Sequence, residues 1–149
     1  HDGADIPVLN LVMKREFAEA ILKGEKKVEY RGYSPHYTDR LYDKETLHFM
    51  DLHKDDEALL IGCEPLRQVY KIHFHNYNNT WFLDVECTAN VLVAATPENG
   101  DYFISEYGSA DLKEMGDEFR KNPLHKGDSP LVFAFILGSV LDTNLPKPE

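Results

Sequence analysis

Cysteine, positive charge and long apolar runs are the features that this sequence has least of. Its two cysteines, Cys63 and Cys87, are too few for a disulfide framework in a chain of 149 residues. No apolar run reaches the roughly 18 residues that a membrane-spanning helix needs. The first residues also lack the charged-then-apolar pattern of a signal peptide. We therefore expect a reduced, cytoplasmic protein that does not enter a membrane.

The shortage of positive charge limits the ligands that the protein can take. The chain has 16 Lys and Arg residues against 26 Asp and Glu residues, a formal net charge of −10. Because a nucleic acid gains much of its affinity for a protein when its phosphates are neutralised, an acidic surface repels it. An RNA site on this chain would have to be a focused basic cleft. Otherwise the ligand is smaller, such as a nucleoside.

Apolar residues, in contrast, are plentiful. The sequence is 42% hydrophobic and 11% aromatic, which is enough to form a substantial core, and its length is typical of one domain. We predict a single domain over residues 7–141. A disordered or cloning-derived end (residues 1–6) precedes it, and a frayed tail with two prolines (residues 142–149) follows it.

Hydrophobic periodicity predicts a mixture of strands and helices. Alternating apolar residues at 68–75 and 81–93, separated by a turn at 76–79, indicate a long antiparallel hairpin with one buried face. The spacing of Phe17 and Ile21 predicts a helix over 14–23, and Ser34 before Pro35 predicts the start of another. Gly138 is expected to form a bulge in the last strand. The other predictions are strands at 7–13, 27–31, 46–52 and 130–140, a polar turn at 53–57, a loop at 97–108 and a helix at 109–121.

These patterns predict an α+β fold of several antiparallel strands with two or three helices. The strand patterns alone do not choose between a barrel and a half-covered sheet. No repeat, low-complexity segment or linker divides the chain.

Gly24 lies where the first helix is expected to end, because glycine adopts the left-handed conformation without a Cβ clash. It opens the pattern Gly-x-Lys-x-x-Glu-x-Arg, which Gly24, Lys26, Glu29 and Arg31 form here. This pattern follows an expected strand and an amphipathic helix. In that context it resembles the signature of the ASCH family. The resemblance is specific over residues 9–41 and covers the rest of the chain by general pattern.

The resemblance implies a PUA-like fold, which is a small antiparallel β-barrel with two or three flanking helices and a cleft beside the signature. Such folds are associated with RNA binding, so the implied partner is RNA or a modified nucleoside, and no cofactor is expected. One branch of compact bacterial members hydrolyses the acetyl amide of N4-acetylcytidine with the signature lysine, a threonine and a distant glutamate. Here Lys26 matches the lysine, Glu29 stands at the threonine position without its hydroxyl, and Glu106 is the candidate for the distant glutamate. Metal-dependent RNA cleavage is also associated with the family, and no local motif here indicates it.

The side chains of the signature residues also indicate possible functions without reference to the family. A lysine in a cleft can act as a base when its surroundings lower its pKa, and Arg31 offers a planar fork for phosphate or carboxylate. Glu29 can act as a base or neutralise these two cations. In a regular strand Glu29 and Arg31 share one face, so Lys26 joins them only if the strand begins after it or twists. The alternative is a surface ion-pair ladder that contributes little.

Two further groups of residues carry possible site chemistry. Tyr37 and Arg40 lie one helical turn apart, where they could stack on a base and contact a phosphate, or simply pack and be solvated. His73 and His75 share one side of a strand and could contribute to a zinc site. No Cys or carboxylate at a recognised metal spacing completes such a site, so a solvated strand face is favoured and no metal site is predicted.

Two functional hypotheses follow. The first is a binding module for RNA, or for a nucleotide within it, with Gly24, Lys26, Arg31, Tyr37 and Arg40 around the ligand. The second is a small amidohydrolase acting on an acylated nucleoside, with Lys26 as base and Glu29 or Glu106 assisting. The acidic charge favours a small ligand, and the missing threonine disfavours the hydrolase. The binding module is narrowly favoured, catalysis stays open, and the oligomeric state is not predicted.

Overall fold

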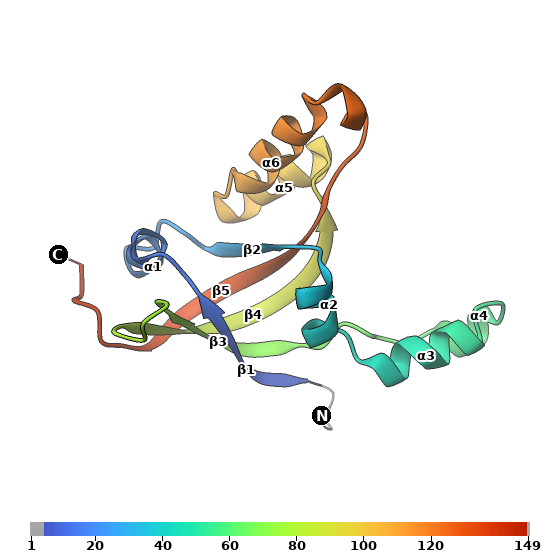
Figure 1. The fold of residues 1–149 in the computed structure, drawn as a ribbon, viewed down its shortest axis with the longest axis horizontal. Helices are drawn as coiled ribbons and strands as arrows, with labels where there is room; N and C mark the ends of the chain where they lie inside the picture. The colour runs from blue at the N-terminus through green and yellow to red at the C-terminus, as the bar shows by residue number, and fades with distance from the viewer. Residues whose placement is uncertain (1–4, 149) are drawn as a thin grey trace.

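The computed structural model describes residues 5–148, and most of the end predicted at residues 1–6 lies outside this range. The described chain forms a five-stranded sheet with six α-helices, so the α+β class is confirmed, with more helices than the two or three expected. Figure 1 shows the arrangement. The elements are β1 (Ile6–Val12), α1 (Arg15–Leu22), β2 (Val28–Gly32), α2 (Pro35–Leu41), α3 (Lys44–Leu52), α4 (Glu57–Leu60), β3 (Val69–His75), β4 (Phe82–Ala94), α5 (Pro97–Tyr107), α6 (Asp111–Arg120), a 3-10 turn (Pro123–His125) and β5 (Leu131–Thr143).

The sheet has the strand order β1-β3-β4-β5-β2 and is not closed into a barrel. β1 pairs with β3 in parallel, whereas the β3–β4, β4–β5 and β5–β2 pairs are antiparallel. The all-antiparallel barrel of the sequence prediction is therefore corrected to an open mixed sheet. A parallel neighbour for β1 requires a long crossover, and the chain between β1 and β3 supplies it by sending β2 to the opposite edge.

The core lies on both sides of this sheet. The larger cluster joins the inward-facing residues of β1, β3, β4 and β5 to Ala18 and Ile21 of α1 and Leu41 of α2. The smaller cluster places Phe103 of α5 and Leu112 of α6 against β2 and one end of β5. Figure 1 shows α5 and α6 together over that part of the sheet, on the opposite side of the molecule from α3 and α4. Residues of α1, β2 and α6 together line one cleft.

The predicted hairpin of β3 and β4 is confirmed, but its apolar alternation changes phase along β4. Leu83, Val85 and Cys87 are buried as expected. Farther on, the polar Asn90 is buried and the apolar Val91 is 41% exposed, so the expected alternation of apolar residues on the buried face does not hold there. The reason is a set of register shifts in the β4–β5 pairing between Asp84 and Ala89.

The expected irregularity at Gly138 is confirmed by the same pairing. Val85 pairs with Val140 and Cys87 with Leu137, so β5 has one residue more than β4 in this interval. A Cβ atom on Gly138 would meet the movable end of the exposed Glu86 side chain and would lie 2.9 Å from Thr88 Cγ2, so a larger residue at this position would require both side chains to shift.

Two sequence predictions of secondary structure were wrong. The strand expected at 46–52 is helix α3, whose first turn is capped by Asp43, which accepts hydrogen bonds from Glu45 N and Thr46 Oγ1. The loop expected at 97–108 is helix α5, which begins after the capping side chain of Thr96 and ends at Gly108 with φ of 65°. No residue of α3 or α4 is buried, and Figure 1 shows these helices projecting away from the sheet.

The C-terminal residues are held more firmly than their composition suggests. β5 continues through Asp142 and Thr143, where the sequence predicts the start of a frayed tail. Thr143 Oγ1 donates to Phe82 O at 2.7 Å, and Leu145 beyond it is buried. Among the described helices, none has both the length and the apolar character needed to cross a membrane.

Candidate functional site

Lys26 reaches the same side of the molecule as Glu29 and Arg31 because it lies before β2 and not within it. The α1 helix ends at Leu22 with Lys23 as its cap, and Gly24 follows in the left-handed conformation with φ of 77°. The backbone N–H groups of Glu25 and Lys26 both bond to Ala20 O, so the chain is still wrapped around the helix end at Lys26. β2 begins only at Val28. The sequence left two arrangements open, and the structure has the strand starting after Lys26.

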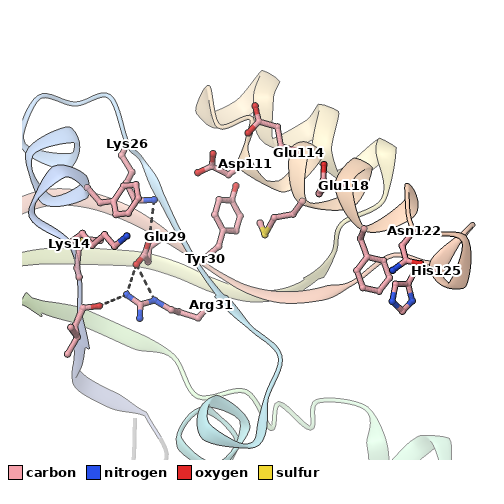
Figure 2. A pocket seen from close by; sticks show the side chains of 15 residues that line it. Lys14, Lys26, Glu29, Tyr30, Arg31, Asp111, Glu114, Glu118, Asn122 and His125 are labelled. Carbon is pink, nitrogen blue, oxygen red and sulfur yellow. Dashed lines mark hydrogen bonds and ion pairs between the residues drawn. The ribbon is translucent and has the colours of Figure 1, made fainter. Parts of the chain in front are cut away.

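The three charged signature residues form one compact cluster around the Glu29 carboxylate (Figure 2). Lys26 Nζ lies 3.1 Å from Glu29 Oε1 and donates to Val28 O at 2.9 Å. Arg31 donates to Glu29 Oε2 from Nε at 3.1 Å and from Nη2 at 2.7 Å. The side chains of Lys26, Glu29 and Arg31 are 14%, 10% and 19% exposed. This burial excludes the exposed ion-pair ladder considered from the sequence.

Arg31 also joins the two edge strands of the sheet. Its Nη2 donates to Val12 O on β1 at 2.9 Å, and its Nη1 donates to the Tyr37 hydroxyl at 3.0 Å. Arg40, which lies on α2, makes a similar contact with β1: its Nη2 donates to Asn10 O at 3.0 Å. These side chains therefore bridge the gap between β1 and β2 that backbone hydrogen bonds leave open.

The electrostatic surroundings keep the Arg31 guanidinium charged. Burial alone would lower its pKa, but the adjacent Glu29 carboxylate and the hydrogen bonds to Glu29 and Tyr37 raise it above its ordinary value. Because Nε, Nη1 and Nη2 all donate within the protein, Arg31 has too few free N–H groups to form a bidentate pair of hydrogen bonds with a phosphate.

A cleft of about 1060 Å³ opens beside this cluster. Figure 2 shows Lys26, Glu29 and Arg31 along one wall and the residues of α6 along the opposite wall. The residues that line the cleft are Val12, Met13, Lys14, Phe17, Lys26, Glu29, Tyr30, Arg31, Asp111, Glu114, Met115, Glu118, Phe119, Asn122 and His125.

The α6 wall is acidic. Asp111, Glu114 and Glu118 are spaced three and four residues apart, so they follow one face of the helix toward the cleft. Glu118 lies 3.3 Å from the exposed Lys121, which neutralises it in part. The lining as a whole has four carboxylates, including Glu29, against the three cations Lys14, Lys26 and Arg31.

Aromatic and apolar groups occupy the space between these charges. Phe119 and His125 stack at the end of the cleft remote from Glu29, with ring centroids 4.2 Å apart (Figure 2). Tyr30 lies at the base of the cleft, and its hydroxyl is 2.8 Å from Ser109 Oγ. Burial raises the pKa of Tyr30 to about 12, so this hydroxyl stays neutral at physiological pH.

Comparisons with known proteins give similarity in fold only. The chain is similar to a crystal structure of ASCH from Zymomonas mobilis, with 16% identity and a TM-score of 0.42 over 99% of this chain and 85% of the other. It is also similar to a mutant form of the Zymomonas mobilis ASCH protein, with 16% identity and a TM-score of 0.46 over 97% of this chain and 86% of the other. No protein-family model and no curated protein matches the chain.

The residues proposed from the sequence fall into two sets. Lys26, Glu29 and Arg31 lie together and line the cleft. The other four, Gly24, Tyr37, Arg40 and Glu106, do not line it. Tyr37 and Arg40 stabilise the bridge to β1, with Arg40 also stacked 6.0 Å from the Tyr37 ring, and Glu106 is exposed on α5.

Sequence reasoning missed the opposite wall of the cleft. The signal was present in α6, where the acidic residues Asp111, Glu114 and Glu118 share a face with Met115 and Phe119. Nothing in the local sequence indicates that this face lies across from Lys26, since the two walls come from segments far apart along the chain. A carboxylate wall was therefore found only through the tertiary structure.

Proposed function

We propose that the cleft binds a single nucleoside, and that the protein is a small-ligand module and not a binder of the RNA backbone. The observation that carries this proposal is the mixed charge of the lining, in which four carboxylates face three cations around apolar side chains. Ligand sites of this kind are largely apolar, with a few polar groups that fix orientation.

The charges argue against a phosphate backbone in the cleft. Each phosphate placed near Asp111, Glu114 or Glu118 would meet repulsion instead of the neutralisation from which nucleic-acid affinity arises. Arg31 uses its donors internally, and the chain as a whole carries a net charge of −10. A neutral nucleoside avoids this repulsion and offers hydroxyl and amino donors that carboxylates accept.

The apolar residues of the cleft suit a planar base. Phe17, Met115 and Phe119 present flat or flexible apolar surface on both sides of the opening, and stacking of a base on an aromatic ring contributes about 1–3 kcal/mol. Lys26 has three N–H donors, and its two polar contacts within residues 5–148 are Val28 O and Glu29. Its remaining donor is suited to a carbonyl oxygen of the base.

Calorimetric titration with cytidine, uridine, adenosine and guanosine tests the proposal. We expect at least one nucleoside to bind at one site per chain. Lys26→Met should weaken that binding, whereas Lys44→Met, which changes a lysine whose side chain is 75% exposed and which lies outside the cleft lining, should leave it unchanged. Absence of binding by all four nucleosides to the folded protein would reject the proposal.

Amide hydrolysis of an acylated nucleoside is a second candidate, favoured by one contact. Lys26 Nζ lies 3.1 Å from Glu29 Oε1, so the candidate base and an assisting carboxylate are within hydrogen-bond reach of each other in one cleft. With Lys26 as the base, its amine would take a proton from a water molecule as that water attacks the acyl carbon, and the amine leaving group would receive this proton as the amide bond breaks. Glu106 plays no part in this scheme, because it does not line the cleft.

Chromatographic analysis of N4-acetylcytidine incubated with the protein tests this candidate. Cytidine and acetate should appear with the wild type and not with Lys26→Ala. Turnover that is equal in both proteins would mean that Lys26 is not the base. No turnover by a wild-type protein that binds the compound would leave the binding role alone.

A further inference from the structure

A pair of histidines on β3, outside the cleft lining, forms a second candidate site. His73 and His75 are two residues apart on β3, so their side chains share a face. Their ring centroids are 5.5 Å apart with the planes inclined by 30°. Neither residue lines the cleft, and the large core cluster contains Ile72 and Phe74, which flank His73 in the sequence, but neither histidine.

Each histidine is anchored through the same ring nitrogen. His73 Nδ1 lies 2.5 Å from Asp84 Oδ1, and His75 Nδ1 lies 2.9 Å from the backbone oxygen of Asn76. A carbonyl oxygen only accepts hydrogen bonds, so Nδ1 of His75 carries the proton. The Asp84 carboxylate selects the same tautomer in His73. In both neutral rings the lone pair is therefore on Nε2.

This pattern is typical of histidines that bind metals. A metal-bound histidine almost always donates its other ring N–H to a carboxylate or a backbone carbonyl, which fixes the ring and increases its basicity. Here the two rings have one partner of each kind before any metal is present. The side chains of His73 and Asp84 are 33% and 14% exposed, so the imidazole is accessible while its carboxylate partner is sheltered.

We propose that His73 and His75 form a two-histidine site for a divalent transition metal such as Zn²⁺, bound through the two Nε2 atoms. Imidazole ligands suit zinc, copper and nickel. Residues 5–148 contain no group of three or more His, Cys, Asp or Glu side chains arranged to hold a metal, so water completes the coordination. Asp84 is a positioning residue, and Lys71 Nζ, 3.8 Å from its Oδ2, is the nearby cation that opposes metal binding.

Zinc titration by calorimetry measures the site directly. Every sample carries His1→Ala, because His1 lies outside the described residues and could bind metal by itself. We expect one zinc ion per chain, with affinity reduced more than 10-fold by either His73→Ala or His75→Ala. Asp84→Ala should reduce affinity about 10-fold, the lower end of the effect of removing such a partner. His48→Ala and His53→Ala are the matched controls and should change nothing.

Electron paramagnetic resonance with Cu²⁺ gives an independent readout. The spectrum should show two coordinated nitrogens in the protein with both histidines, and one after either is replaced. Circular dichroism on each variant confirms that it is folded, and the His75 variant remains informative if Asp84→Ala is unstable. The proposal is overturned by a lack of saturable zinc binding, by binding that survives both histidine substitutions, or by a one-nitrogen copper spectrum.

Discussion

Replacing Arg31 by methionine should destabilise the fold far more than replacing an exposed arginine. The substitution removes the two hydrogen bonds to Glu29, the bond to Val12 O and the bond to Tyr37. It also leaves a Glu29 side chain that is only 10% exposed with Lys26 as its remaining cation. Breaking a buried ion pair by removing one partner costs about 3–5 kcal/mol of stability. Because the Arg31 side chain is 19% exposed, we expect the free energy of unfolding to fall by about 3 kcal/mol, the lower end of this range.

Arg15→Met is the matched control. Arg15 pairs with Glu19 at 3.9 Å, and their side chains are 53% and 50% exposed. Exposed pairs of this kind contribute about 0–1 kcal/mol. The two arginines therefore differ in burial and in the number of partners, while the substitution is the same.

Urea denaturation measures both losses through the unfolding midpoint and the slope m. With m of about 1.5 kcal/mol/M, a loss of about 3 kcal/mol lowers the midpoint by about 2 M. A double variant with Glu29→Gln should lose less than the sum of the two single variants, because they disrupt one cluster. A loss below about 1 kcal/mol for Arg31→Met, equal to that of Arg15→Met, would refute the role assigned to Arg31.

Three other predictions concern groups outside this cluster. Because burial raises the pKa of Tyr30 to about 12, the wild type should lose stability as pH rises from about 10 to 12, and Tyr30→Phe should lose less over that range in chemical denaturation. Gly116→Ala should cost about 2 kcal/mol, because its Cβ would lie 2.2 Å from a backbone oxygen, whereas Gly32→Ala meets no atom within 4 Å and should leave the thermal midpoint nearly unchanged. Cys63 should react with an aromatic disulfide reagent in the folded protein, whereas Cys87 should react only on unfolding, because it is buried with its pKa raised to about 11.

Arg31 and Lys26, although both belong to the signature, have different proposed roles: one stabilises the fold and the other contacts the ligand. Arg31 closes the gap between β1 and β2, so its loss should affect stability first. Lys26 lines the cleft and bonds only to Val28 O and Glu29 within the described chain, so its loss should affect ligand affinity first. Measuring stability and affinity on both variants distinguishes these roles.

Local patterns were sufficient to predict the elements that carry the signature. The left-handed turn at Gly24 just after α1, the start of α2 at Pro35 and the bulge at Gly138 each follow from the chemistry of one or two residues. The β3–β4 hairpin follows from alternation around a short turn. These predictions succeeded because they depend on neighbours in the chain.

Elements whose signals conflicted were predicted less well. Residues 46–52 have apolar residues at several spacings, and only the capping side chain of Asp43 identifies the helix. In α5, Thr96 and Gly108 are suitable helix ends, but Asn99 and Gly100 within the first turns suggested a loop. The parallel pairing of β1 and the acidic wall of α6 depend on the path of the whole chain, which no local pattern contains.

The measurement that most directly tests the central claim compares a free nucleoside with a ten-nucleotide RNA of mixed sequence on the same protein. Calorimetry at low and at high salt should show nucleoside binding that hardly changes with salt, and RNA binding that is no tighter per site. This result would agree with a cleft that has more carboxylates than cations in its lining. RNA that binds more tightly than every nucleoside, with an affinity that falls steeply as salt is added, would contradict the account.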